Sequence, residues 1–129
     1  MSSYNRFVLI KLLQEDIYPN TPIYSCGTTY DSIVLVDPNE PLVPESVIIE
    51  KYPAYLLAHN LTILRRERNM RLLQSDIYGL SDYPFKSDDN KQAWFVYRQS
   101  LRDITTLYPE PETDENDNLI NIIWPVIPS

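Results

Sequence analysis

Residues 54–77, with the sequence AYLLAHNLTILRRERNMRLLQSDI, decide the fold that this chain is expected to adopt. Apolar side chains recur there at steps of three and four residues, which is the period of an α-helix. One side of this helix, apolar except for Arg68, comprises Leu57, Leu61, Leu64, Arg68 and Leu72. A second side comprises Leu56, Ile63, Met70, Leu73 and Ile77. A helix with two apolar sides is expected to be covered twice, once by a second helix and once by a β segment or a partner chain.

The second helix follows a loop that Gly79 and Pro84 mark. Ser87 is a good N-cap, and Asp88 and Asp89 place negative charge in the first turn, where the helix dipole favours it. This helix should run to about Thr106, because the prolines that follow prevent its continuation. The two helices are predicted to form an antiparallel hairpin. Its expected core consists of Leu61, Leu64, Leu72, Leu73, Trp94, Tyr97, Leu101 and Ile104.

The first part of the chain has the signals of a small β segment. Residues 7–13 are apolar and partly β-branched, which indicates a strand, with a short buried helix as the alternative. Residues 23–26 and 32–36 are two further strand candidates, separated by a turn at Gly27. The prolines of residues 37–53 indicate an extended connector, in which Val47, Ile48 and Ile49 can form an edge strand.

The last part of the chain is expected to be extended. Residues 110–118 form an acidic loop flanked by prolines, and residues 119–124 have strong β propensity. Pro125 and Pro128 then favour an extended end. The predicted class is therefore α+β, with a β or extended segment over residues 1–53, the helical hairpin over 54–108, and the acidic loop and Trp-Pro tail over 109–129.

The composition limits the function classes. The 129 residues carry a net charge of -7, which argues against nucleic acid and against anionic membrane surfaces as partners. No run approaches the roughly 20 apolar residues that span a bilayer. Eleven prolines against two glycines, together with ten tyrosines, indicate extended segments that suit protein contacts. The composition therefore favours a protein that binds other proteins.

No pattern of residues indicates catalysis, a cofactor or a metal. His59 is the only histidine and Cys26 the only cysteine, so an enzyme using Cys26 is the weakest of the hypotheses. The run 114–118 looks like a calcium loop, but it lacks the central glycine and the closing glutamate. We therefore expect no catalytic, cofactor or metal site.

Charged residues around the two helices are expected to pair with one another. Several arginines lie between residues 65 and 71, and they are expected to meet acidic side chains of this chain or of an acidic partner. Such pairs would fix the register of the hairpin. The residues concerned are Arg68, Asp76, Arg98, Arg102 and Asp103.

Three motifs carry a family resemblance. Residues 68–76 read RNMRLLQSD, residues 94–104 read WFVYRQSLRDI, and residues 124–128 read WPVIP. In order and spacing they resemble the helical region of bacteriophage tail assembly chaperone proteins, over about residues 65–129. Two departures stand out. Ile77 replaces the tryptophan of the family pattern, and residues 110–118 lengthen the final connection.

The resemblance implies a non-enzymatic protein of phage tail assembly in the host cytoplasm. It would bind a tail-fibre or baseplate protein, and either leave as a chaperone or stay in the virion tail as an adaptor. A homo-oligomer within a symmetric assembly is a further expected partner. An alternative is a small acidic phage protein that binds a host protein. The predicted partner-binding residues are Val47, Ile48, Ile49, Ile122, Trp124, Pro125 and Pro128.

Overall fold

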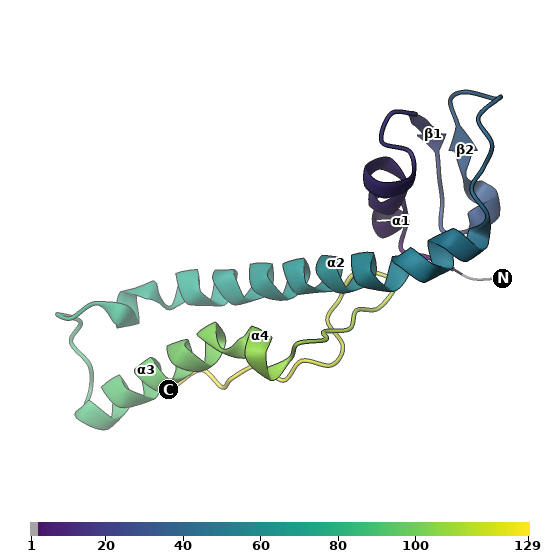
Figure 1. Cartoon of the computed structure of the whole chain (residues 1–129). Helices are drawn as coiled ribbons and strands as arrows, with labels where there is room; N and C mark the ends of the chain where they lie inside the picture. Colours follow the sequence, from purple (N-terminus) through teal and green to yellow (C-terminus); the bar gives the residue numbers. More distant parts are fainter. Residues whose placement is uncertain (1–2) are drawn as a thin grey trace. The chain divides into compact units, whose positions relative to one another are not determined.

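The computed structural model describes residues 3–129 and contains helices together with a small antiparallel sheet (Figure 1). The α+β class predicted from the sequence is confirmed at this level. The chain divides into two compact units between His59 and Asn60, inside the long helix α2, Glu45–Gln74. Each unit has its own apolar cluster.

The first unit begins with helix α1, Arg6–Leu12, where a strand was the first interpretation. Asn5 caps the helix, since its side chain accepts hydrogen bonds from the backbone N–H groups of Phe7 and Val8. A π-helical turn, η1, continues it over Leu13–Ile17. The strand prediction is wrong and its helical alternative is right, because the buried side chains follow a helical face. They are Val8, Leu9, Leu12 and Leu13.

The small sheet pairs β1, Ile23–Ser25, with β2, Val34–Leu35. The strands are antiparallel, with Ile23 opposite Leu35 and an irregular register towards Ser25. A 3₁₀ turn, η2, Tyr30–Ser32, lies between them. The first strand agrees with the prediction. The second is shorter than predicted, because Tyr30–Ser32 forms the turn.

Helix α2 starts at Glu45, so the interpretation of residues 37–53 as an extended connector is wrong beyond Pro44. Pro53 lies inside the helix, although it removes a backbone donor there. Packing outweighs this cost. Ile48 has no exposed surface, and the ring of Tyr52 meets that of Tyr4 edge-on at 4.9 Å.

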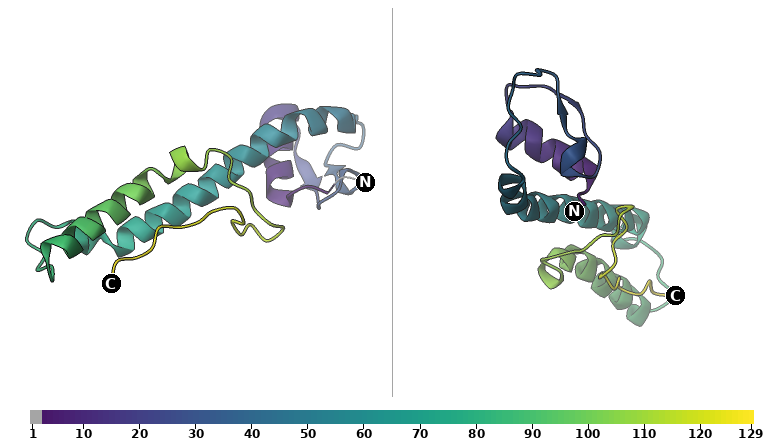
Figure 2. Two further views of the ribbon diagram at one scale, coloured as in Figure 1. Left: turned by 90° about the horizontal axis from the view of Figure 1, so that it is seen from below. Right: turned by 90° about the vertical axis from the view of Figure 1, so that its right-hand side faces the viewer.

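The second unit contains the C-terminal part of α2, the 3₁₀ turn η3, Asp76–Gly79, helix α3, Asp88–Arg102, and helix α4, Ile104–Leu107. Figures 1 and 2 show α3 running back along the C-terminal part of α2. Ser87 caps α3 as predicted, because its Oγ accepts a hydrogen bond from the backbone of Asn90. Asp103 interrupts the predicted single helix before α4.

The strand predicted over residues 119–124 is wrong. Only an isolated bridge joins Leu119 to Thr113. The backbone N–H of Ile120 donates to the Glu112 carbonyl instead, and that of Ile123 donates to the Tyr108 hydroxyl. High β propensity does not make a strand where no neighbouring strand is aligned.

We predict that Ile48→Ala lowers the free energy of unfolding by about 2–5 kcal/mol, because it leaves a cavity in a fully buried site. Its neighbour Ile49 is 52% exposed and serves as the matched control. Ile49→Ala should change stability by about 0.5 kcal/mol or less. Chemical denaturation followed by far-UV circular dichroism measures both. Equal, small effects would contradict the helical packing of this segment.

Candidate functional site

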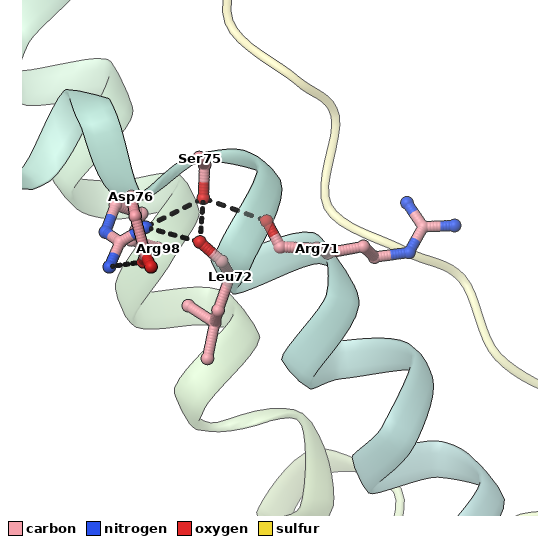
Figure 3. A network of polar contacts seen from close by, with 5 residues as sticks. All are labelled: Arg71, Leu72, Ser75, Asp76 and Arg98. Carbon is pink, nitrogen blue, oxygen red and sulfur yellow. Dashed lines mark hydrogen bonds and ion pairs between the residues drawn. The ribbon is translucent and has the colours of Figure 1, made fainter.

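The junction between α2 and α3 is held by a polar network around Arg98 (Figure 3). One terminal nitrogen of Arg98 donates to the Leu72 carbonyl at 2.9 Å and to the Ser75 hydroxyl at 2.8 Å. The other donates to the Asp76 carboxylate at 3.1 Å. The Arg98 side chain is only 11% exposed, whereas that of Asp76 is 59% exposed. The hydrogen bonds of Arg98 to Leu72 and Ser75 therefore provide most of the stabilisation, and the exposed ion pair with Asp76 provides little.

This network satisfies the end of α2. The last four carbonyls of a helix have no partner within the helix, and they carry partial negative charge. The Ser75 hydroxyl lies within hydrogen-bond distance of the Arg71 and Leu72 carbonyls. Arg98 adds a full positive charge from the neighbouring helix. Two of the motifs in the sequence thus meet at one helix end.

An aromatic cluster lies beside the network. Tyr78 stacks on Trp94 with a centroid distance of 3.7 Å and an interplanar angle of 7°. Tyr97 meets Trp94 edge-on at 5.7 Å. Trp94, Tyr97 and Leu101 are buried, and Leu72 packs against them. Ile77, which stands where the family pattern has tryptophan, is 52% exposed, and the next residue, Tyr78, makes the aromatic contact instead.

The C-terminal arm, which we define as residues 119–129, is attached to this cluster through Trp124. Trp124 packs against the cluster, and the Arg71 guanidinium lies 4.3 Å from the centre of its ring. Such a cation–π contact contributes about 0.5–2 kcal/mol. The Nε of Arg71 also lies 3.3 Å from the Glu67 carboxylate, although it has no hydrogen-bond geometry there. Figure 3 shows the Arg71 side chain directed towards the arm.

The acidic loop is attached to α2 through Asn60, which sequence reasoning missed. The Asn60 side chain is buried, donates to the Pro111 carbonyl at 3.1 Å and accepts from the Thr113 hydroxyl at 2.8 Å. A buried amide needs such partners. The sequence signal that could have identified Asn60 was a polar amide on an otherwise apolar side of the predicted helix.

Within the loop, Asp114 organises the backbone. Its carboxylate accepts hydrogen bonds from the backbone N–H groups of Asn116 and Asn118 and from the Asn118 side chain. The backbone hydrogen bond from Asn118 is the main reason that the pKa of Asp114 lies below its ordinary value. In the described part of the chain, no group of three acidic, histidine or cysteine side chains is arranged to hold a metal.

The other residues predicted for the hairpin core differ in how deeply they are buried. Leu64 and Ile104 are buried, and Leu61 is half-buried. Leu73 is 71% exposed, so its placement in the core is wrong. Leu72 takes the inward position, and the next residue of a helix points about 100° away from it.

In the described part of the chain, Arg68, Arg102 and Asp103 form no ion pair across the two helices. The Arg68 Nε donates to the neighbouring Asn69 side chain, and the Asp103 carboxylate accepts from Gln99. Arg102 is exposed. Among residues 3–129, Arg98 and Asp76 are the members of the predicted set that form an ion pair with each other.

The predicted partner-binding residues fall into two groups. Ile48 is fully buried in the first unit, so it is not available to a partner in this fold. Val47 is half-buried, and Ile49 is exposed on helix α2. Ile122, Trp124, Pro125 and Pro128 are half-buried along the arm. Val47 and Ile49 lie in a helix, so that segment does not provide the extended form that the prediction required.

The Cys26 thiol is in a poor environment for a nucleophile. It is buried, and burial raises its pKa more than the nearby Arg6 guanidinium lowers it. A thiol with a raised pKa is mostly protonated, and the thiolate is the reactive form. Among the described helices, none has the length and apolar character that a membrane span requires.

Comparison with known families agrees with these motifs. The family model of phage tail assembly chaperone proteins matches residues 61–129, which is more than half of the chain. The chain therefore belongs to the phage tail assembly chaperone family, and the resemblance seen in the sequence is confirmed. Neither a search of curated proteins nor one of solved structures found a significant match.

We predict that Arg98→Ala lowers the free energy of unfolding of the second unit by about 1.5–3 kcal/mol, since it removes hydrogen bonds from a charged, mostly buried donor. Arg102→Ala, one turn later and exposed, should cost about 0.5 kcal/mol or less. Both tryptophans, Trp94 and Trp124, lie in the second unit, so fluorescence during denaturation reports on it. Equal losses in the two variants would refute the capping role of Arg98.

We also predict that the loop around Asp114 loosens in acid. A carboxyl whose pKa is lowered in the folded state stabilises that state above its ordinary pKa, and the contribution is lost as the pH falls through the lowered value. In an acid titration, the NMR signals of the Asn116 and Asn118 amides should move together, with a midpoint below the ordinary carboxyl value. Asp114→Asn is the control and should abolish this transition. A midpoint at or above the ordinary value would contradict the arrangement.

Proposed function

We propose that this chain binds a tail-fibre or baseplate protein while the phage tail is assembled in the host cytoplasm, and that it does so without catalysing a reaction. Membership of the tail assembly chaperone family supports the assembly role. The binding surface is chosen because of the C-terminal arm. The arm packs on the second unit but leaves apolar side chains exposed.

The exposed side chains of the arm are large. Ile120 is 61% exposed, Ile123 80% and Val126 89%. Isolated exposed apolar residues are ordinary, but these three lie on one short segment together with Ile127, which is 58% exposed, and such a group favours a contact with another protein. The arm also has free backbone groups. Within residues 3–129, the backbone from Trp124 to Pro128 forms no hydrogen bond.

The arm is nevertheless held in place. Trp124 packs against the aromatic cluster, and the carbonyl of Ser129 accepts a hydrogen bond from the Asn90 side chain. Pro125 and Pro128 fix two further backbone angles. A segment that is already ordered loses less entropy when it docks. Free backbone groups with exposed apolar side chains suit the edge of a partner's β-sheet, to which the arm would add a strand.

The surrounding chemistry favours binding over catalysis. The single cysteine is buried with a raised pKa, and the polar network around Arg98 is engaged in capping α2.

Mass spectrometry of purified virions distinguishes a chaperone that leaves from an adaptor that stays. Affinity capture with the tail-fibre and baseplate proteins of the same phage, alongside host proteins, separates the tail role from a host-directed one.

We predict that Ile120→Asp/Ile123→Asp weakens binding to the tail partner about tenfold or more, because charged groups would replace apolar contacts. Leu107→Asp is the matched control. Leu107 is 68% exposed on α4, outside the arm, and its substitution should leave affinity unchanged. Isothermal titration calorimetry with the purified partner measures both. Unchanged affinity in the arm variant, with normal circular dichroism, would exclude the arm as the interface.

A further inference from the structure

Two open grooves lie in the second unit. The first, of about 450 Å³, lies on α2 and is lined by Thr62, Arg65, Arg66, Asn69, Met70 and Leu73. The second, of about 740 Å³, lies between α3 and the arm. Its α3 side is lined by Asp89, Gln92, Ala93, Val96, Tyr97 and Ser100.

Opposite charges lie at the two grooves, and among residues 3–129 none of them has an ion-pair partner. Arg65 and Arg66 are exposed, and within residues 3–129 they form neither an ion pair nor a side-chain hydrogen bond. The same holds for Asp88 and Asp89 at the start of α3. In a chain of net charge -7, two adjacent unpaired arginines form a local basic patch that matches the acidic patch at α3.

The two helices carry these charges and the apolar residues in the same order. Five of the residues that line the α2 groove have a counterpart at a constant offset on α3. The pairs are Arg65 with Asp88, Arg66 with Asp89, Asn69 with Gln92, Met70 with Ala93, and Leu73 with Val96. If the two helices lie parallel, arginines meet aspartates, amides meet, and larger apolar side chains meet smaller ones. An antiparallel alignment would instead set the arginines against Val96 and lose the charge match.

These pairs cannot form within one copy, because there α3 runs back along α2 and contacts it through Leu72, Trp94 and Tyr97 (Figure 2). We infer that the α2 groove of one copy docks in parallel on the α3 groove of a second copy. Val126, 89% exposed, and Ile127, 58% exposed, line the arm side of the α3 groove and add apolar surface for Met70 and Leu73.

The interface would be heterologous, because each copy uses one surface to dock and another to receive. Repetition of such a contact produces a ring when the rotation closes and a helical filament when it does not. The inference goes beyond the proposed binding of a tail partner and does not depend on it. Self-association can be tested with the full chain alone.

Analytical ultracentrifugation of the full chain tests the inference. The average mass should exceed the 15.1 kDa of one chain and rise with concentration. Arg65→Glu/Arg66→Glu and Asp88→Arg/Asp89→Arg should each raise the dissociation constant about tenfold or more, because attraction becomes repulsion. An equimolar mixture of the two variants should associate again, since the reversed α2 surface of one matches the reversed α3 surface of the other.

Three further variants make the test specific: two should leave association intact and one should prevent it. Lys11→Glu/Arg102→Glu makes the same change in net charge as Arg65→Glu/Arg66→Glu, but at exposed sites outside both grooves. It should leave association intact. Leu73→Asp replaces an exposed apolar side chain that would contact the second copy, so it should prevent association. Because the position is exposed, the variant should stay folded, and it therefore tests the inference even if a charge variant folds poorly. Ile120→Asp/Ile123→Asp, which weakens the proposed partner site, should still self-associate.

Three results would overturn the inference. The first is a wild-type chain that stays monomeric at every accessible concentration. The second is association that survives both Leu73→Asp and the α2 charge reversal. The third is a mixture of folded charge variants that fails to associate, which would mean that α2 does not dock on α3 of a second copy.

Discussion

The capping of α2 by Arg98 is the interaction on which the second unit depends. A helix end with unsatisfied carbonyls must find donors, and here the donor is a guanidinium from the helix that packs alongside. The same contact closes the end of α2 and sets the position of α3 relative to it. The stacking of Tyr78 on Trp94 follows, because both rings lie next to the residues that make the polar contacts.

The arm takes its position from this junction. Arg71 lies one turn before the end of α2, and its guanidinium lies over the ring of Trp124. The arm is therefore anchored at Trp124, although within residues 3–129 the backbone from Trp124 to Pro128 forms no hydrogen bond. At the other end of the unit, Asn60 holds the acidic loop that leads into the arm. Polar side chains on α2 thus anchor the final segment at two separate places.

The strands predicted at residues 7–13 and 47–49 are helical for a shared reason. Residues 7–13 and 47–49 are short apolar runs, and such runs do not distinguish a strand from a buried helix. Pro53 also suggested a break, but the helix continues through it because Ile48 and Tyr52 pack on the first unit. The exposure of Leu73 has a similar origin, since only one of two adjacent leucines can point into the core.

The sequence by itself determined the family, the start of α3 at its Ser87 cap and the inward face of α3 with Trp94, Tyr97 and Leu101, because these depend on local spacing and capping. It also placed Arg98 and Asp76 among the residues expected to pair, with Arg102 as the other candidate partner of Asp76. Only the tertiary structure decided that residues 6–12 and 45–53 are helical, that Asn60 is a buried anchor, and that residues 119–124 form no strand. Those outcomes depend on which surfaces are close enough to bury side chains and satisfy backbone groups, and contacts between residues far apart in the chain leave little local signal.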